Sequence, residues 1–154
     1  MSWEKRKAAF ELCKKYGAVI LEDNPYGDLR FAGEDVKSIK TLDTEGSVIY
    51  SGTFSKILSP GIRVGYVCAH KDIVQKIVVC KQVADVHSTM WSQMLAYRFL
   101  KKYDLDEHLA KLRRVYEHKT NLMLSEIDKN FSSKITHTNP VSYTHLTLPT
   151  TSRV

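Results

Sequence analysis

Two short segments of the chain concentrate side chains whose types and spacing could support chemistry. Residues 23–26 offer the Asp23 carboxylate and the Tyr26 phenol, and residues 51–66 offer hydroxyls, a lysine and an arginine. An arginine beside hydroxyls and loop amides suits a phosphate dianion, because the planar guanidinium pairs two phosphate oxygens at once. The second segment is therefore a candidate phosphate site.

A lysine in the same segment suits attack on a carbonyl group. Lys56 lies in a loop expected between buried strands and close to an arginine, and both surroundings favour a neutral amine, the form that attacks. A carboxylate held by a proline-containing turn, such as Asp23, can hold a proton on a ring nitrogen. A phosphate, an aldehyde and a basic ring nitrogen together describe pyridoxal 5′-phosphate (PLP).

Each of these residues also has an ordinary structural interpretation when taken alone. Lys56 would then be a solvated surface charge, and Asp23 and Tyr26 would be turn residues. Arg63 would be a surface partner of an acidic side chain. The joint pattern, rather than any single residue, favours a cofactor site.

The elements that must position the first segment form half of an α/β unit. Residues 3–16 repeat apolar side chains at helical spacing, including Tyr16 on the expected buried face, with Ser2 as a cap and Gly17 as a terminator. Residues 18–21 are an apolar run typical of a buried strand. The polar residues from 22 onward then follow the carboxyl end of that strand, where ligand sites gather in open α/β sheets.

Two further strands are expected at residues 47–51 and 63–68. The first is far enough from residues 18–21 for a parallel crossover containing a short helix near residues 36–42. The loop at residues 53–62 is short for a helical crossover, so the third strand is expected to run antiparallel to the second.

The remainder of the chain has helical periodicity. One helix is expected over residues 72–101, with an irregularity near residues 85–89. A second begins after Asp104, a capping residue with Glu107 three positions later, and continues to Phe131. Its apolar stripe is expected to be core, and comprises Leu105, Leu109, Leu112, Tyr116, Met123 and Ile127.

Composition excludes several classes of protein. The 154 residues are 43% hydrophobic and 26% charged, as expected for one globular domain without an apolar run of the length of a membrane span. The net charge of +6 is spread along the chain, which favours solvated helix faces over nucleic-acid binding. No secretory signal or CxxC spacing is seen, so a cytoplasmic protein with reduced thiols and no metal site is expected.

The last residues differ in character from the rest. Residues 141–154 contain four threonines and no acid, and they resemble translated read-through of a sequencing adapter. We therefore expect a partial enzyme domain over residues 1–140 and a non-native tail over residues 141–154. A threonine-rich strand or natural tail is the alternative.

The two chemical segments resemble a known family. Glu-Asp-Asn-Pro-Tyr-Gly-Asp-Leu-Arg-Phe at residues 22–31 and Ser-Gly-Thr-Phe-Ser-Lys-Ile-Leu-Ser-Pro-Gly-Ile-Arg-Val-Gly-Tyr at residues 51–66 are similar to class I/II aminotransferases of PLP fold type I. The branch resembles the aminoadipate/kynurenine aminotransferases, and the resemblance covers about residues 1–140. It implies an α/β fold: part of a three-layer α/β/α large domain whose mostly parallel sheet contains one antiparallel strand.

The resemblance implies a role for each site residue. Lys56 would bind PLP as a Schiff base and then move a proton between substrate and cofactor. Asp23 would pair with the protonated ring nitrogen, and Tyr26 would hydrogen-bond the ring oxygen. The phosphate would be held by Thr53, Ser55 and Arg63, with Thr53 standing where many relatives have serine.

The implied activity is transfer of an amino group from an amino acid to a 2-oxo acid, in amino acid metabolism, by a homodimer. The family's substrate arginine and several cofactor contacts lie outside this sequence, so these 154 residues alone are expected not to transaminate. Two alternatives keep the fold: the PLP-binding sensor domain of a bacterial transcription regulator, and a PLP-dependent lyase or decarboxylase. Upstream sequence would distinguish the first alternative, and product analysis the second.

Overall fold

The computed structural model describes residues 1–132 and 136–142, and most of the threonine-rich segment lies outside the described residues. The described chain forms two compact units. The first combines Met1–Pro25 with Asp35–Tyr103, and the second combines Tyr26–Glu34 with the described residues from Asp104 onward.

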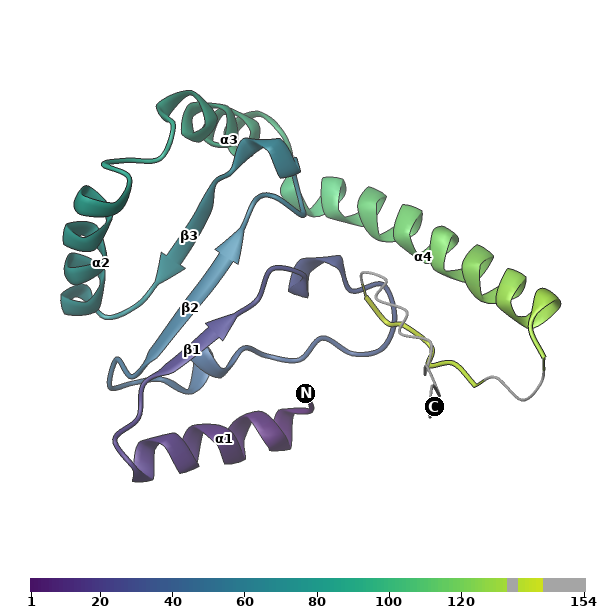
Figure 1. The fold of residues 1–154 in the computed structure, drawn as a ribbon, viewed down its shortest axis with the longest axis horizontal. Helices are drawn as coiled ribbons and strands as arrows, with labels where there is room; N and C mark the ends of the chain where they lie inside the picture. The colour runs from purple at the N-terminus through teal and green to yellow at the C-terminus, as the bar shows by residue number, and fades with distance from the viewer. Residues whose placement is uncertain (133–135, 143–154) are drawn as a thin grey trace, which may run out of the picture. The chain divides into compact units, whose positions relative to one another are not determined.

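A three-stranded mixed sheet organises the first unit (Figure 1). Its strands are β1 (Ile20–Asp23), β2 (Val48–Thr53) and β3 (Gly65–Cys68), in that spatial order. β1 and β2 are parallel, whereas β2 and β3 are antiparallel. The antiparallel direction predicted from the short connecting loop is therefore confirmed.

Helix α1 (Trp3–Lys15) supplies the core beneath the β1–β2 pair. The Ser2 hydroxyl accepts a hydrogen bond from the Lys5 amide at 3.4 Å, and Gly17 follows the helix with φ of +64°, as the predicted cap and terminator require. Phe10 packs with two residues of the crossover and β2, namely Ile39 and Val48. Tyr16 was expected on this buried face, but it is exposed because the helix ends one residue earlier.

The crossover from β1 to β2 contains a 3₁₀ turn, η2 (Ile39–Leu42), in place of the short helix expected at residues 36–42. The buried Asp43 carboxylate then holds the turn into β2 by accepting backbone hydrogen bonds from Gly46, Ser47 and Val48. Burial alone would raise the pKa of Asp43, but Lys40 at 2.8 Å and these backbone amides outweigh it and hold the pKa well below its usual range.

The apolar run expected as a buried strand is only half-buried. Val19 and Leu21 are exposed, and β1 alternates between partly buried and exposed residues. Alternation arises because α1 and the crossover cover one face of β1 while Leu21 lies on the other.

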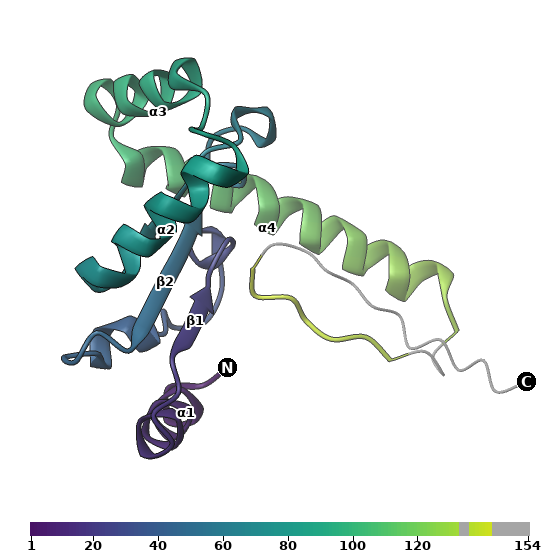
Figure 2. The same ribbon diagram turned by 60° about the vertical axis from the view of Figure 1, so that its left-hand side comes forward.

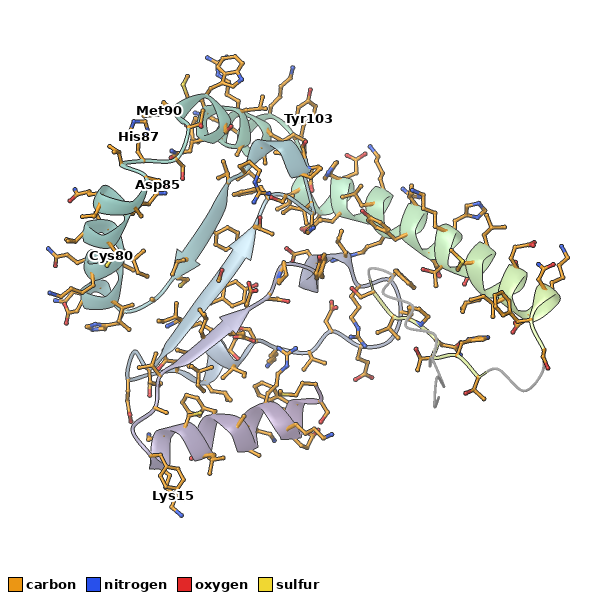
Figure 3. All side chains as sticks on the ribbon, in the orientation of Figure 1. Lys15, Cys80, Asp85, His87, Met90 and Tyr103 are labelled. Carbon is orange, nitrogen blue, oxygen red and sulfur yellow. The ribbon has the colours of Figure 1, made fainter. Side chains whose placement is uncertain are left out.

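The helical stretch after β3 is two helices, α2 (Lys71–Ala84) and α3 (Met90–Lys102). The break falls at the irregularity predicted near residues 85–89, where Figure 3 labels Asp85 and His87. Val86 lies in this break with φ of +63°, a conformation that a β-branched residue rarely adopts. The chain direction therefore changes between the two helices without a glycine.

The second unit consists of helix α4 (Leu105–Asn130), the 3₁₀ turn η1 (Gly27–Leu29) and the segment at residues 136–142 (Figure 2). The Asp104 carboxylate accepts a hydrogen bond from the Glu107 amide at 3.0 Å, which confirms the predicted cap. Leu109 and Ile127 of the predicted stripe are buried, but Met123 is half-exposed and Thr120 is buried instead. Thr120 keeps the helical spacing to Ile127, so the buried face is rotated slightly from the apolar stripe.

Within residues 1–132 and 136–142, no helix is long and apolar enough to cross a membrane. The same residues contain no cluster of three or more His, Cys, Asp or Glu side chains arranged to hold a metal ion.

Candidate functional site

The predicted site residues of the first unit gather at the carboxyl ends of β1 and β2. Asp23 is the last residue of β1, and Thr53 is the last residue of β2. Asp23 is aligned with Ser51 in the parallel register. Because side chains alternate between faces along a strand, Asp23, Ser51 and Thr53 share one face of the sheet.

The register also sets the separation of Asp23 from Thr53. Neighbouring strands are about 4.8 Å apart and rise about 3.3 Å per residue, so the two Cα atoms are about 8 Å apart. The ladder continues one residue beyond Asp23, since the Asn24 amide donates to the Ser51 carbonyl at 3.0 Å. The Asp23 side chain is exposed at this edge and can reach a bound molecule.

Thr53, Ser55 and Arg63 form a connected polar cluster. The Ser55 amide donates to the Thr53 hydroxyl at 3.1 Å, and the Arg63 guanidinium donates to the Ser55 hydroxyl at 3.2 Å. Ser55 is buried, whereas Arg63 is exposed, so a fixed hydroxyl is joined to an accessible cation. Two hydroxyls and a guanidinium are a donor set that suits a phosphate dianion.

Arg63 reaches this cluster through an unusual backbone conformation. It follows the 3₁₀ turn η3 (Pro60–Ile62) with φ of +53° and ψ of +38°, in the left-handed region. Immediately after it, the Val64 carbonyl accepts a hydrogen bond from the Phe54 amide at 3.0 Å. The left-handed residue therefore returns the chain to β3 while its side chain stays at the end of β2.

Lys56 lies in the turn that connects β2 to η3. The Leu58 amide donates to the Phe54 carbonyl at 2.8 Å and closes the turn, and Ile57 is buried beside Lys56. Lys56 itself is half-buried and directly follows the buried Ser55. The lysine is thus held on a short, anchored turn next to the phosphate-type cluster.

Close contact between β2 and β3 underlies this geometry. A Cβ atom on Gly65 would lie 2.9 Å from the Gly52 carbonyl oxygen, and one on Gly52 would clash with the hydroxyl end of the Tyr66 side chain. Both glycines therefore allow β3 to approach β2 at the point where the chain enters β3 after Arg63. On the same face as Gly52, the Tyr50 hydroxyl accepts a hydrogen bond from the Asn24 side chain at 3.0 Å.

Glu22 is a structured residue that the sequence reasoning did not single out. It lies on the face of β1 opposite Asp23, and its carboxylate accepts hydrogen bonds from the amides of Ile39 and Lys40 at 2.9 and 3.0 Å. The Arg6 guanidinium donates to it at 3.2 Å. The sequence placed Glu22 in the polar loop after the strand expected at residues 18–21, whereas Glu22 is the third residue of β1.

Tyr26 follows Asp23 by three residues and precedes η1, and it belongs to the second unit. The structure thus brings together five of the six predicted residues in one unit: Asp23, Thr53, Ser55, Lys56 and Arg63.

This donor set fits PLP. The cluster of Thr53, Ser55 and Arg63 suits the phosphate, the neighbouring Lys56 suits the aldehyde, and Asp23 lies on the same sheet face as Thr53.

Comparison with known proteins identifies the family. The family model "Aminotransferase class I and II" matches residues 2–151. The chain belongs to the class I and II aminotransferase family. It is 39% identical over 140 residues to aromatic-amino-acid aminotransferase 1 of Thermococcus litoralis, covering 91% of this chain and 34% of that protein.

The aminotransferase fold is also found in solved structures. The kynurenine aminotransferase of Pyrococcus horikoshii, solved in complex with PMP, matches with a TM-score of 0.86 and 36% identity. The match covers 92% of this chain and 35% of that one. It confirms the predicted fold class, a part of the α/β large domain of a PLP-dependent transferase.

This aminotransferase chain spans about a third of the length of the relatives it matches. It is also 36% identical to the uncharacterized HTH-type transcriptional regulator YisV of Bacillus subtilis, over 74% of this chain and 24% of that protein. The chain is therefore similar both to proteins named as aminotransferases and to a protein named as a transcriptional regulator.

Proposed function

We propose that this chain is the lysine-bearing part of a PLP-dependent aminotransferase that moves an amino group from an amino acid to a 2-oxo acid. The observation that carries the proposal is the Thr53–Ser55–Arg63 cluster beside Lys56, on the edge of the sheet that also bears Asp23. When bound there, PLP supplies an aldehyde that takes up an amino group and a ring that accepts electrons.

The cluster binds the cofactor through its phosphate. The Arg63 guanidinium and the Ser55 and Thr53 hydroxyls would donate to phosphate oxygens. The hydrogen bond from the Ser55 amide to the Thr53 hydroxyl and the one from Arg63 to the Ser55 hydroxyl hold these side chains in place. Because Ser55 is buried, its hydroxyl keeps a fixed position without bound ligand. A phosphate held there would place the cofactor beside the turn that carries Lys56.

Lys56 and Asp23 carry the chemistry from two sides of the ring. The Lys56 amine would hold the cofactor through its aldehyde group, and as a free amine it would carry the proton that moves at the reacting carbon. The Asp23 carboxylate would accept a hydrogen bond from the ring nitrogen and would keep that nitrogen protonated. The family resemblance gives Tyr26 the role of a hydrogen-bond donor to the ring oxygen, which is proposed here for the full-length protein.

The full protein is proposed to be a cytoplasmic homodimer acting in amino acid metabolism. Support for assembly comes from exposed apolar side chains on α2 and α3, of which Val83 and Trp91 are 87% and 73% exposed. Large apolar side chains left open to water are typical of surfaces that other protein covers.

The proposal is tested on the full-length protein by treating it with borohydride after PLP binding. We expect a stable mass addition on the peptide that contains Lys56, and transfer of an amino group from amino acid donors to 2-oxo acids. Labelling of another lysine, or formation of amines or alkenes in place of the 2-oxo product, would contradict the proposal.

A second candidate function is suggested by the similarity to the HTH-type regulator. In that case the domain would bind PLP and an effector without turnover. Full-length protein that shows the lysine-linked cofactor, binds DNA through an upstream basic domain and gives no transamination would favour this second function.

A further inference from the structure

We propose that Glu22 is a positioning residue that fixes the direction of the Asp23 carboxylate toward the cofactor ring nitrogen. This inference rests on the proposed function. Glu22 does not itself contact the ligand in this proposal, and it acts by holding the Asp23 carboxylate in position.

Glu22 ties three separate segments together. Its Oε1 atom accepts the Ile39 amide and the Arg6 guanidinium, and its Oε2 atom accepts the Lys40 amide. Arg6 also donates to the Lys37 carbonyl at 2.9 Å. The Glu22 side chain is only 10% exposed, so these hydrogen bonds are shielded from water and strengthened.

The position next to Asp23 makes this anchor relevant to the site. β1 has four residues and pairs with β2 through its backbone, and the chain turns away at Pro25, which has no amide hydrogen to donate. Successive side chains on a strand point to opposite faces, so a rotation of the backbone at Glu22 turns Asp23 with it. Glu22 therefore holds the strand end from the face opposite the ligand.

The anchor requires a carboxylate rather than a side chain of similar size. A glutamine would direct its NH₂ group at either the Lys40 amide or the Ile39 amide, because both are hydrogen-bond donors. One amide would then face another donor, and the crossover would move away from β1. The Glu22→Gln substitution thus removes the anchor while preserving volume.

The experiment uses the full-length PLP-loaded protein and compares Glu22→Gln with Glu45→Gln. Glu45 makes an exposed ion pair with Lys14, far along the chain from the strand end, and serves as the matched control. The main readout is the pH midpoint at which the visible absorbance of the lysine-linked cofactor changes. Cofactor affinity and amide hydrogen exchange at Ile39 and Lys40 are measured in parallel.

A misdirected Asp23 carboxylate would stabilise the protonated ring nitrogen less, so the ring would carry less positive charge. The Lys56 nitrogen linked to that ring would then hold its own proton to a higher pH. We expect Glu22→Gln to raise the midpoint and to lower kcat by about tenfold to a hundredfold, with KM for the amino donor nearly unchanged. Exchange at both amides should accelerate, and Glu45→Gln should match the wild type throughout.

A purely structural role gives a different result. If Glu22→Gln unfolds at lower temperature but its loaded form keeps the wild-type midpoint and kcat, the inference is overturned. If Glu22→Gln does not fold, Glu22→Asp, which keeps the charge but reaches less far, is judged by the same midpoint. A wild-type protein without a borohydride-reducible cofactor band would instead overturn the proposed function, and the inference with it.

Discussion

The Arg63 guanidinium donates a hydrogen bond to the buried Ser55 hydroxyl at 3.2 Å, joining the two ends of the turn that carries Lys56. The donor and acceptor are eight residues apart, and Arg63 reaches back from a left-handed backbone position. Since Lys56 directly follows Ser55, this hydrogen bond bridges the turn on which the lysine lies. The phosphate-type cluster and the lysine therefore belong to the same short connection between β2 and β3.

Removing the amine tests the covalent link. Lys56→Ala in the full-length protein should abolish the visible, pH-dependent absorbance of the lysine-linked cofactor and the borohydride-stable mass addition. Lys76→Ala, which removes an exposed lysine of α2, is the matched control and should retain both signals. A borohydride-reducible band that survives in Lys56→Ala would contradict the assignment.

Removing the guanidinium tests the phosphate site. Arg63→Ala should weaken PLP binding by about tenfold to a hundredfold, as expected when a hydrogen bond between charged groups is lost. Arg63→Lys should recover only part of the affinity, because an ammonium cannot make the paired contacts of a guanidinium. Affinity is measured by titrating PLP, with pyridoxal lacking the phosphate as the comparison ligand. An equal loss of pyridoxal binding would argue against a phosphate contact.

Removal of the Asp23 carboxylate is expected to lower turnover more than it lowers the affinity for PLP. Asp23→Ala should lower kcat by about a hundredfold or more, because a ring nitrogen without the opposite charge of a carboxylate loses its proton more readily and the ring then accepts electrons less well. PLP affinity should fall much less, since the phosphate contacts of Thr53, Ser55 and Arg63 remain. Single-turnover kinetics with the loaded protein separate the two effects. Unchanged turnover would remove Asp23 from the site.

Features set by local chemistry could be predicted from the sequence. The Asp104 cap, the break before Met90 and the antiparallel β3 follow from capping residues and loop length, and they are confirmed. Features set by tertiary neighbours could not. The exposure of Met123, like the burial of Thr120, depends on what lies against α4.

The candidate site also has features that could be predicted from the sequence and features that could not. The order of the two motifs indicated that Asp23 and Lys56 follow neighbouring strands, but the shared face of Asp23 and Thr53 depends on a register that residue types do not specify. The anchoring role of Glu22 depends on amides of a 3₁₀ turn that were expected to belong to a short helix.

The buried Asp43 carboxylate makes the free energy of unfolding depend on pH in the acidic range. Its pKa is lowered in the folded protein, so its contribution is fully present above the unfolded pKa of 3.8 and is lost as pH falls through the lower folded value. We expect Asp43→Asn to reduce the free energy of unfolding at neutral pH by about 1.5–3 kcal/mol, the range for hydrogen bonds to a charged group. Denaturant unfolding should show this difference shrinking toward acidic pH, whereas a constant difference would contradict the mechanism.

β2 and β3 approach each other closely at Gly65, and this contact can be tested by substitution. In Gly65→Ala, the new Cβ would lie 2.9 Å from the Gly52 carbonyl oxygen, and backbone must move to relieve the contact. We expect a loss of about 1–3 kcal/mol in the free energy of unfolding, as for other overpacked sites, and weaker PLP binding because Arg63 enters β3 through Val64. Gly61→Ala is the matched control, since its nearest neighbour would be 4.0 Å away. Equal stability and cofactor affinity in the two variants would show that the β2–β3 contact does not position Arg63.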